Sequence, residues 1–322
     1  MENKSVSRRD ALRLAGVAGL TAAAAQLSSA NAQTATPAAS SSTPALPVNG
    51  SGFYRFKVGE YTVTVLSDGQ SPPGNTFPNW GANPDRQPVY EAALRENFLD
   101  PSRFVNNFNP MIVDTGKNKV LMDTGRGGQN GQLLASLARA GYKAEDIDTV
   151  FLTHGHGDHI GGLTMGGQPT FPKAQLVMGE GEFQFWTTQA TPNDAVKNNM
   201  IALKDRYKLI KPGADIVGGV TSLASFGHTA NHLAVRVSSG TSTLTHFADA
   251  GGHYILSFRF PEHYLGFDTD KAQAVATRAK LFAEAADTRQ MVVGYHFAWP
   301  AVGYVKRKDS AFEYVPAFFQ LT

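Results

Sequence analysis

The chain contains no cysteine among its 322 residues. A disulfide framework is therefore excluded, and a metal site must use histidine and oxygen ligands in place of thiolates. Outside its N-terminus the chain also lacks an uninterrupted apolar run of membrane-spanning length. We therefore expect no membrane span in the mature protein.

The chain beyond its first 32 residues has no net charge. The formal charge of the whole chain is +2, and the leader accounts for it with four basic and two acidic residues. The remaining chain is balanced, so its charge does not favour nucleic acid or a membrane surface as a partner.

The N-terminal segment predicts an export signal. The pair Arg8-Arg9 precedes an apolar run at residues 14–25, and an A-x-A cleavage site follows at residues 30–32. The paired arginines resemble a bacterial twin-arginine signal. Ala11 stands where that signal usually has a large apolar residue, so an ordinary secretory signal is the alternative.

Three segments with different roles follow from this composition. We expect a twin-arginine-type signal peptide at residues 1–32 and a periplasmic or secreted protein. Residues 33–52 are rich in Ala, Ser, Thr and Pro, which predicts a flexible linker. We expect the folded domain to occupy residues 53–322.

Strand and helix patterns alternate along this domain. Two strand-rich halves, each ending in a helix, predict an α/β fold with two sheets packed between helical layers. The expected strands are 61–66, 111–113, 119–123, 147–152, 175–178, 221–226, 233–237, 242–247, 291–295, 303–306 and 312–315, and the expected helices are 132–140, 181–188, 193–209 and 270–286.

Residues 70–90 contain five prolines and predict a long irregular loop. Phe77 and Trp80 lie in it. Their aromatic side chains could line a pocket or fill a gap in the core, and the sequence favours neither.

Metal-ligand side chains are concentrated after the strand expected at 147–152. His154, His156, Asp158 and His159 lie within six positions. Residues two apart on extended backbone point the same way, so His154 and His156 can bind one cation and the following pair a second. Imidazole and carboxylate suit zinc, and also iron, manganese or cobalt. This density favours two divalent ions, zinc first, over a surface loop without metal.

Three later residues also follow expected strands, where loops meet at one edge of the fold. They are His228, Asp249 and His296. With them, the sequence resembles the metallo-β-lactamase superfamily. Residues 153–159 match its H-x-H-x-D-H signature, residues 227–232 its G-H-T-x-x-H element, and residues 123–125 its D-T-G turn.

The resemblance implies an αββα sandwich of two mixed sheets between helical layers, with a dinuclear site on one edge. One metal would bind His154, His156 and His228. The other would bind Asp158, His159 and His296, and Asp249 would bridge them. We expect His232 to support the site and not to bind metal.

The bridging carboxylate narrows the activity that the resemblance implies. Members of the superfamily that act as β-lactamases generally lack it, so Asp249 favours lactonases, thioesterases and phosphotriesterases. Within the superfamily the sequence resembles the methyl parathion hydrolases, through residues 52–55, 66–69, 182–186 and 296–303. Residues 70–90 and 126–131 depart from that subgroup.

We therefore expect an exported dinuclear hydrolase whose metal-bridging hydroxide attacks neutral esters, with organophosphate triesters or aryl esters as substrates. A lactonase, including one for acyl-homoserine lactones, is the alternative. An iron-dependent oxidoreductase and a non-catalytic binder are further alternatives. Relatives are often dimers, so a homodimer is also expected.

Several residues have expected roles in this reaction. Asp158 and Asp249 would fix the metals as the catalytic carboxylates. Tyr254 or Tyr295 could donate a proton to the leaving group. The residues expected to line the substrate pocket are Trp186, Trp80, Phe77 and His253.

The bridging role of Asp249 gives a first prediction. Asp249→Ala should lose metal and activity together, because both cations would share this carboxylate. Metal content per chain and turnover, measured on the same sample, check this. A variant that kept two metals and full turnover would show that the bridging assignment is wrong.

Overall fold

The structure is a computed structural model that describes residues 52–318. The signal peptide expected at 1–32 and all but the last residue of the linker expected at 33–52 lie outside the described residues. The first strand begins at Phe53, where the folded domain was expected to start. Within residues 52–318, no helix combines the length and hydropathy needed to cross a membrane.

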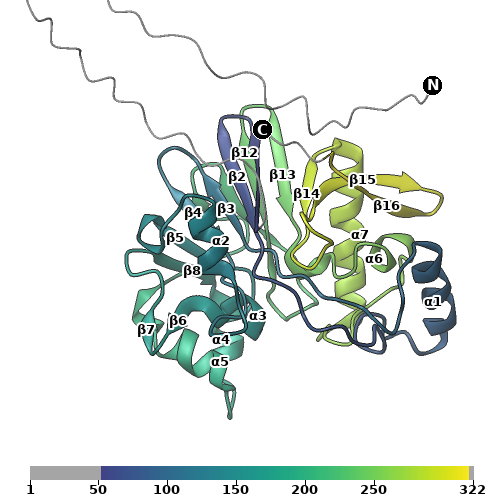
Figure 1. Ribbon diagram of the computed structural model, residues 1–322, viewed down its shortest axis with the longest axis horizontal. Coiled ribbons are helices and arrows are strands. Elements are labelled where there is room, and N and C mark those ends of the chain that lie inside the picture. Colours follow the sequence, from purple (N-terminus) through teal and green to yellow (C-terminus); the bar gives the residue numbers. More distant parts are fainter. Residues whose placement is uncertain (1–51, 319–322) are drawn as a thin grey trace, which may run out of the picture. The chain divides into compact units, whose positions relative to one another are not determined.

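The first sheet has the strand order β1-β2-β3-β4-β5-β8-β9. Its strands pair antiparallel from β1 to β4 and parallel from β4 to β9, so the sheet is mixed. Its strands are β1 (Phe53–Val58), β2 (Tyr61–Leu66), β3 (Met111–Asp114), β4 (Lys119–Met122), β5 (Thr149–Leu152), β8 (Gln175–Gly179) and β9 (Tyr207–Ile210). The helices of this half are α2 (Leu133–Arg139), α3 (Gly157–Ile160), α4 (Glu180–Thr187) and α5 (Asp194–Val196), and β6 (Thr164–Met165) and β7 (Gln168–Pro169) form a small separate hairpin. Helix α1 (Gln87–Glu96) lies on the other side of the molecule, where Tyr90 and Leu94 pack with Leu256 (Figure 1).

The second sheet has the order β10-β11-β12-β13-β14-β15-β16. All its pairs are antiparallel except β13 with β14. Its strands are β10 (Asp215–Val217), β11 (Val220–Ala224), β12 (Leu233–Ser239), β13 (Ser242–His246), β14 (Met291–Val293), β15 (Val302–Lys308) and β16 (Ala311–Pro316), and its helices are α6 (Leu256–Arg259) and α7 (Lys271–Thr288).

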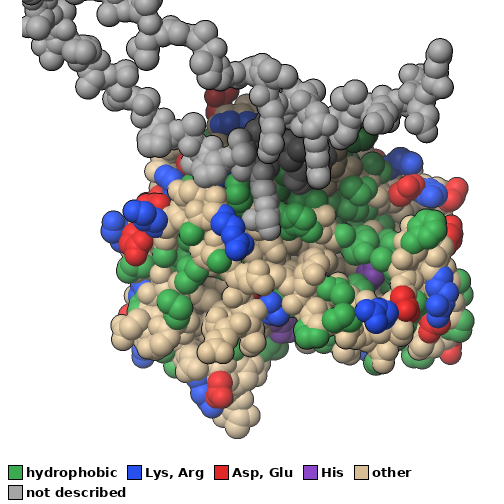
Figure 2. Space-filling view, viewed as in Figure 1, with side chains coloured by type: hydrophobic (Ala, Val, Ile, Leu, Met, Phe, Trp, Pro, Cys, Tyr) green, Lys and Arg blue, Asp and Glu red, His purple; other side chains and the backbone are tan. Residues whose placement is uncertain are grey.

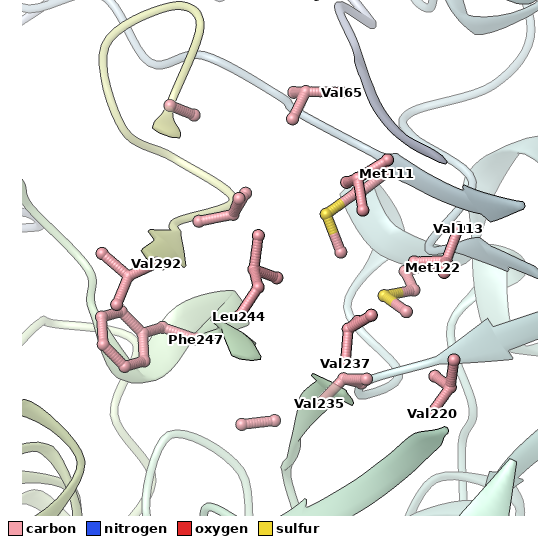
Figure 3. Packing of buried hydrophobic residues seen from close by; sticks show 14 of the residues in the cluster. Val65, Met111, Val113, Met122, Val220, Val235, Val237, Leu244, Phe247 and Val292 are labelled. Atoms are coloured by element: carbon pink, nitrogen blue, oxygen red, sulfur yellow. The ribbon is translucent and has the colours of Figure 1, made fainter. Parts of the chain in front are cut away.

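The inner faces of the two sheets pack against each other. Successive side chains on a strand point to opposite faces, so Val120 and Met122 of β4 join the inner core while Leu121 packs on the outer face. Figure 3 shows Met111 and Met122 of the first sheet opposite Val235 and Leu244 of the second.

Helices cover the outer faces of both sheets. Leu133 and Leu137 of α2 pack on the outer face of the first sheet, in the same cluster as Leu121. On the other side, α7 places Leu281 and Phe282 against the second sheet, and the four layers can be followed in Figure 1. The αββα architecture with two mixed sheets is therefore confirmed.

The helix expected at residues 193–209 is confirmed only in part. The segment is helical as α5, a π-helical turn (Lys197–Ile201) and a 3-10 turn (Lys204–Arg206), but its last expected residues form a strand. Tyr207–Ile210 adds to the edge of the first sheet in parallel with β8. Pairing with a neighbouring strand thus outweighs the helical pattern of this segment.

Helix α1 was missed because its first residues lie in the segment expected to be an irregular loop. Pro88 falls in its first turn, where the missing N–H of proline costs no hydrogen bond. The same proline had been counted as evidence against regular structure.

The packing of β5 gives a prediction about stability. Phe151 is fully buried in the inner core, whereas Phe98 is 98% exposed. Phe151→Ala should lower the free energy of unfolding by about 3–5 kcal/mol, because it leaves a cavity between the sheets. The control Phe98→Ala should change it by less than about 0.5 kcal/mol. Denaturant unfolding of both variants checks this, and equal effects would contradict the packing described here.

Candidate metal centre

The predicted ligands converge at one edge of the sandwich, beyond the ends of strands from both sheets. His154, His156, Asp158 and His159 follow β5, and His228 follows β11. Asp249 lies in a 3-10 turn (Ala248–Ala250) just after β13, and His296 follows β14. The structure brings all seven residues together as two adjoining groups of potential metal ligands.

The first group contains His154, His156, His228 and Asp249. His156 Nδ1 lies 2.9 Å from His154 Nε2 and 3.1 Å from His228 Nε2, and Asp249 Oδ2 lies 3.2 Å from His228 Nε2. Ligand atoms around a tetrahedral zinc ion with bonds near 2.0–2.1 Å are about 3.3 Å apart. The spacing of this group therefore fits one cation.

The second group contains Asp158, His159 and His296. His296 Nε2 lies 3.5 Å from Asp158 Oδ2. Asp249 reaches this group as well, with Oδ1 3.3 Å from His159 Nε2 and Oδ2 3.2 Å from His296 Nε2. One carboxylate thus contacts both groups, which is the arrangement expected of a bridging ligand.

Two of the donor atoms that face the centre have no hydrogen-bond partner, and neighbouring carboxylates orient two of the imidazole rings. His159 Nε2 and Asp249 Oδ1 are buried without a hydrogen-bond partner. Outer partners hold the other ring nitrogens: Nδ1 of His159 lies 2.8 Å from Asp123 Oδ2, and Nδ1 of His228 lies 2.8 Å from Asp268 Oδ1. Because a carboxylate only accepts, each Nδ1 carries the proton and each Nε2 offers a lone pair to the centre. The residues present therefore fit divalent metal.

Neither of these two outer partners, Asp123 and Asp268, was identified as a functional residue from the sequence. Asp123 was noticed only as part of the D-T-G turn. In the structure it has φ 60° and accepts hydrogen bonds from Thr153 N and Oγ1 as well as from His159. Asp268 lies 40 positions from His228, and no sequence motif marks it.

Glu182 is a third outer residue that was missed. It is fully buried on α4. Its carboxylate accepts from Gly155 N (3.2 Å) in the first ligand loop and from Asn231 N (3.1 Å) in the loop after β11. One side chain therefore sets the distance between the two loops that carry His156 and His228.

Electrostatics support a cation at this position. Burial by itself would raise the pKa of Asp249, but the surrounding His296, His159 and His228 outweigh it and hold that pKa well below its usual range. Burial would lower the pKa of His159, yet Asp249, Asp123 and Asp158 raise it well above normal. The carboxylates around His159 thus favour positive charge at this position, which a divalent cation would supply.

His232 and Tyr295 support the site from behind. His232 donates from Nδ1 to Ser225 O (2.9 Å), and its Nε2 accepts from Asp249 N (3.3 Å). Both nitrogens are used, which agrees with the supporting role expected for it. Tyr295 donates to Asp158 O at 2.6 Å and is fully buried, so it holds the ligand loop and is not a free proton donor.

Two of the expected pocket residues lie beside the ligands. The half-buried Trp186 packs edge-on to His156, with ring centroids 5.3 Å apart, and its Nε1 donates to Glu182. The half-buried Trp80 packs edge-on to His296, also at 5.3 Å. Each ring thus lies beside a ligand of a different group.

The other two expected pocket residues are packed away from the centre. Phe77 stacks on Tyr90 in a satellite core cluster with Leu94 and Leu256, which is the core-filling alternative. His253 is buried, with its ring stacked between Phe104 and Tyr254. The structure therefore does not place either side chain among the ligands, because aromatic packing occupies both.

Histidine is almost entirely internal in this protein. Of the nine histidines, all in the described residues, only His156 is not buried. On the face seen in Figure 2, histidine reaches the surface only in small spots. Burial lowers the pKa of His232, His253 and His263 to about 3 and that of His246 to about 4.

The fold and this cluster of seven side chains are those of a metal-dependent hydrolase. Residues 107–290 match the family model of the Metallo-beta-lactamase superfamily, more than half of the chain. The chain belongs to that superfamily.

Relatives found by sequence match parts of the chain. The N-acyl homoserine lactonase of Bacillus cereus is 25% identical over 149 residues, 46% of this chain and 56% of that enzyme. Metallo-beta-lactamase domain-containing protein 1 of Mus musculus is 42% identical over 67 residues, 21% of this chain and 24% of that protein. The chain thus spans about half the length of the first relative and less of the second.

Solved structures match over nearly their whole length. AidC, a dizinc quorum-quenching lactonase in complex with a product, has a TM-score of 0.78 and 29% identity, and the match covers 84% of this chain and 98% of AidC. AbOPH, a hydrolase in the beta lactamase superfamily, has a TM-score of 0.77 and 26% identity, over 84% of this chain and 99% of AbOPH.

The neutral buried histidines give a prediction about pH. Both ring nitrogens of His246 are buried without a partner, and its folded pKa of about 4 lies below the ordinary 6.5. As pH falls below 6.5, the unfolded chain takes up a proton that the folded chain does not, so stability falls with pH. His246→Leu should therefore raise the free energy of unfolding, and raise it more at pH 5 than at pH 8.

The measurement is denaturant unfolding in chelator at both pH values. His263→Leu is the matched control, because His263 uses both nitrogens, with Trp80 O and Ser257 Oγ. Its removal should lower stability at pH 8 by leaving partners unpaired. A His246→Leu variant less stable than wild type at pH 5 would contradict this account.

Proposed function

We propose that this member of the metallo-beta-lactamase superfamily is a dinuclear lactonase that opens acylated homoserine lactones. The observation that carries the proposal is the pair of ligand groups that share Asp249, with Nε2 lone pairs of His159 and His228 directed to the centre. The similarity to AidC, described as a dizinc lactonase, supports both the metal and the substrate class. The similarity to the Bacillus cereus N-acyl homoserine lactonase supports the same substrate.

The seven ligands form two groups, one for each cation. His154, His156 and His228 would bind one, and Asp158, His159 and His296 the other, with Asp249 shared. The donor set of imidazole and carboxylate suits zinc. When bound, such a pair supplies an activated water near neutral pH and a Lewis acid for the carbonyl oxygen of the lactone.

The chain's other residues hold this set rigid and shape the entry. Glu182 fixes the spacing of the loops that carry His156 and His228. Of the two acidic ligands, Asp158 is the more accessible: its side chain is 30% exposed, against 5% for Asp249. Substrate would therefore enter the site on the Asp158 side. Trp80 and Trp186 offer apolar walls to an acyl chain.

The hydrolysis of aryl esters or aryl phosphotriesters is a second candidate. The specific observation in its favour is the position of Trp80 and Trp186, since aromatic rings beside the ligands suit an aryl leaving group. The sequence motifs alone favour this activity, whereas the similarity to AidC and to the Bacillus cereus enzyme supports lactones. The narrower likeness to methyl parathion hydrolases stays a prediction.

Two further properties belong to this proposal. Export through the twin-arginine-type signal would suit a protein that folds around its metals before it crosses the membrane. The homodimer expected from relatives is proposed with it, and size-exclusion chromatography with light scattering would test it.

The test is a substrate panel on protein loaded with zinc. We expect ring opening of N-hexanoyl homoserine lactone with kcat/KM above that for an aryl phosphotriester by at least about tenfold. Asp194→Ala is a matched control, because Asp194 has a side chain 88% exposed and its variant should keep full activity. Lactone turnover below triester turnover in two-zinc protein would overturn the lactonase proposal in favour of the second candidate.

A further inference from the structure

Arg278 is a buried charged residue that contacts none of the proposed metal ligands directly through their side chains. It lies on α7, is 2% exposed and is the largest of the fully buried side chains among the described residues. Arginine is almost never fully buried unless it is paired. The three contacts of its guanidinium therefore indicate its role.

The first contact leads to the shared carboxylate. Arg278 Nε donates to Ala250 O at 2.8 Å. Ala250 directly follows Asp249, in the same short 3-10 turn. The hydrogen bond therefore fixes the backbone that carries Asp249 from the side of α7, while His232 holds Asp249 N from the other side.

The second contact leads to a ligand histidine. Arg278 Nη2 lies 3.7 Å from Asp268 Oδ2, a charge pair in which both side chains are buried. Asp268 in turn holds His228 through Oδ1, at 2.8 Å from Nδ1. The arginine thus balances the charge of the carboxylate that orients His228.

The third contact leads to the pocket wall. Arg278 Nη1 donates to His263 O. His263 Nε2 donates to Trp80 O at 2.8 Å, and the Trp80 ring packs against His296. One guanidinium thus contacts three segments that surround the proposed centre.

We propose that Arg278 is a positioning residue that sets Asp249 and His228, two ligands of the same group, at the spacing that binds the cation. The planar guanidinium donates to two backbone carbonyls and at the same time places its charge beside Asp268, which a lysine ammonium cannot do in this geometry. The inference rests on the metal assignment of the proposed function. Beyond that assignment, the metal affinity of the first ligand group depends on Arg278, a side chain of α7 that touches neither metal nor substrate.

The experiment measures the zinc dissociation constant of the full chain by competition with a chelator dye. Arg278→Met should weaken zinc binding by about tenfold, the lower end of the loss typical for a direct outer partner of a ligand, because Arg278 acts through Asp268 and the Ala250 backbone. Arg278→Lys should restore part of the affinity, because it returns the charge near Asp268 but not the full set of hydrogen bonds. Unfolding of the metal-free variants in chelator reports the purely structural cost.

Arg206 offers a matched control. Like Arg278, it donates to backbone carbonyls, here those of Phe171, Pro172 and Ala174, but none of these belongs to a ligand loop. Arg206→Met should lower stability and leave the zinc dissociation constant within about twofold of wild type. The two arginine variants therefore separate a positioning role from a general loss of stability.

Coupling to Asp268 gives an independent check. If Arg278 acts on His228 through Asp268, the losses of zinc affinity in Arg278→Met and Asp268→Asn should not add in the double variant. If Arg278→Met proves insoluble, Arg278→Lys carries the test, with a loss of at least about threefold expected.

The outcomes separate this inference from the proposed function. Wild-type zinc affinity in both Arg278 variants would overturn the positioning role and leave the proposed function standing. Equal losses in the Arg278 and Arg206 variants would also overturn it. A wild-type protein that bound no zinc would overturn the metal assignment itself, and this inference with it.

Discussion

The buried carboxylate of Asp249 is the constraint on which the rest of this structure depends. It lies within 3.3 Å of ring nitrogens from three histidines, and a fourth is 3.9 Å away. An ionised carboxylate out of water is costly unless cations surround it. In the metal-free protein, protonated imidazoles can supply part of that charge. Two divalent cations would supply it fully, which is why we regard the cluster as a site built for metal.

The fold serves this carboxylate by bringing together segments that are far apart in the chain. Ligands come from loops after β5, β11, β13 and β14, so both sheets must pack in the correct register for the cluster to form. Buried polar groups then fix each loop: Asp123 and Asp268 orient imidazoles, and Glu182 links two loops. The inner core shown in Figure 3 keeps the sheets in place. Stability and site geometry are therefore carried by the same packing.

The ligand set could be predicted from the sequence because its spacing is local. Four candidate ligands lie within residues 154–159, and the others follow β-strand patterns. Asp268 and Arg278 could not be predicted in the same way, since their partners are remote in the chain and only the packing of α7 brings them close. The edge strand β9 was missed for a related reason, because its conformation depends on pairing with β8.

The most direct test of the central claim is a crystal structure of the zinc-loaded protein with anomalous data above and below the zinc absorption edge. The account predicts two zinc peaks, one among His154, His156 and His228 and one among Asp158, His159 and His296, with Asp249 between them. A single peak, or peaks away from these residues, would contradict the dinuclear centre.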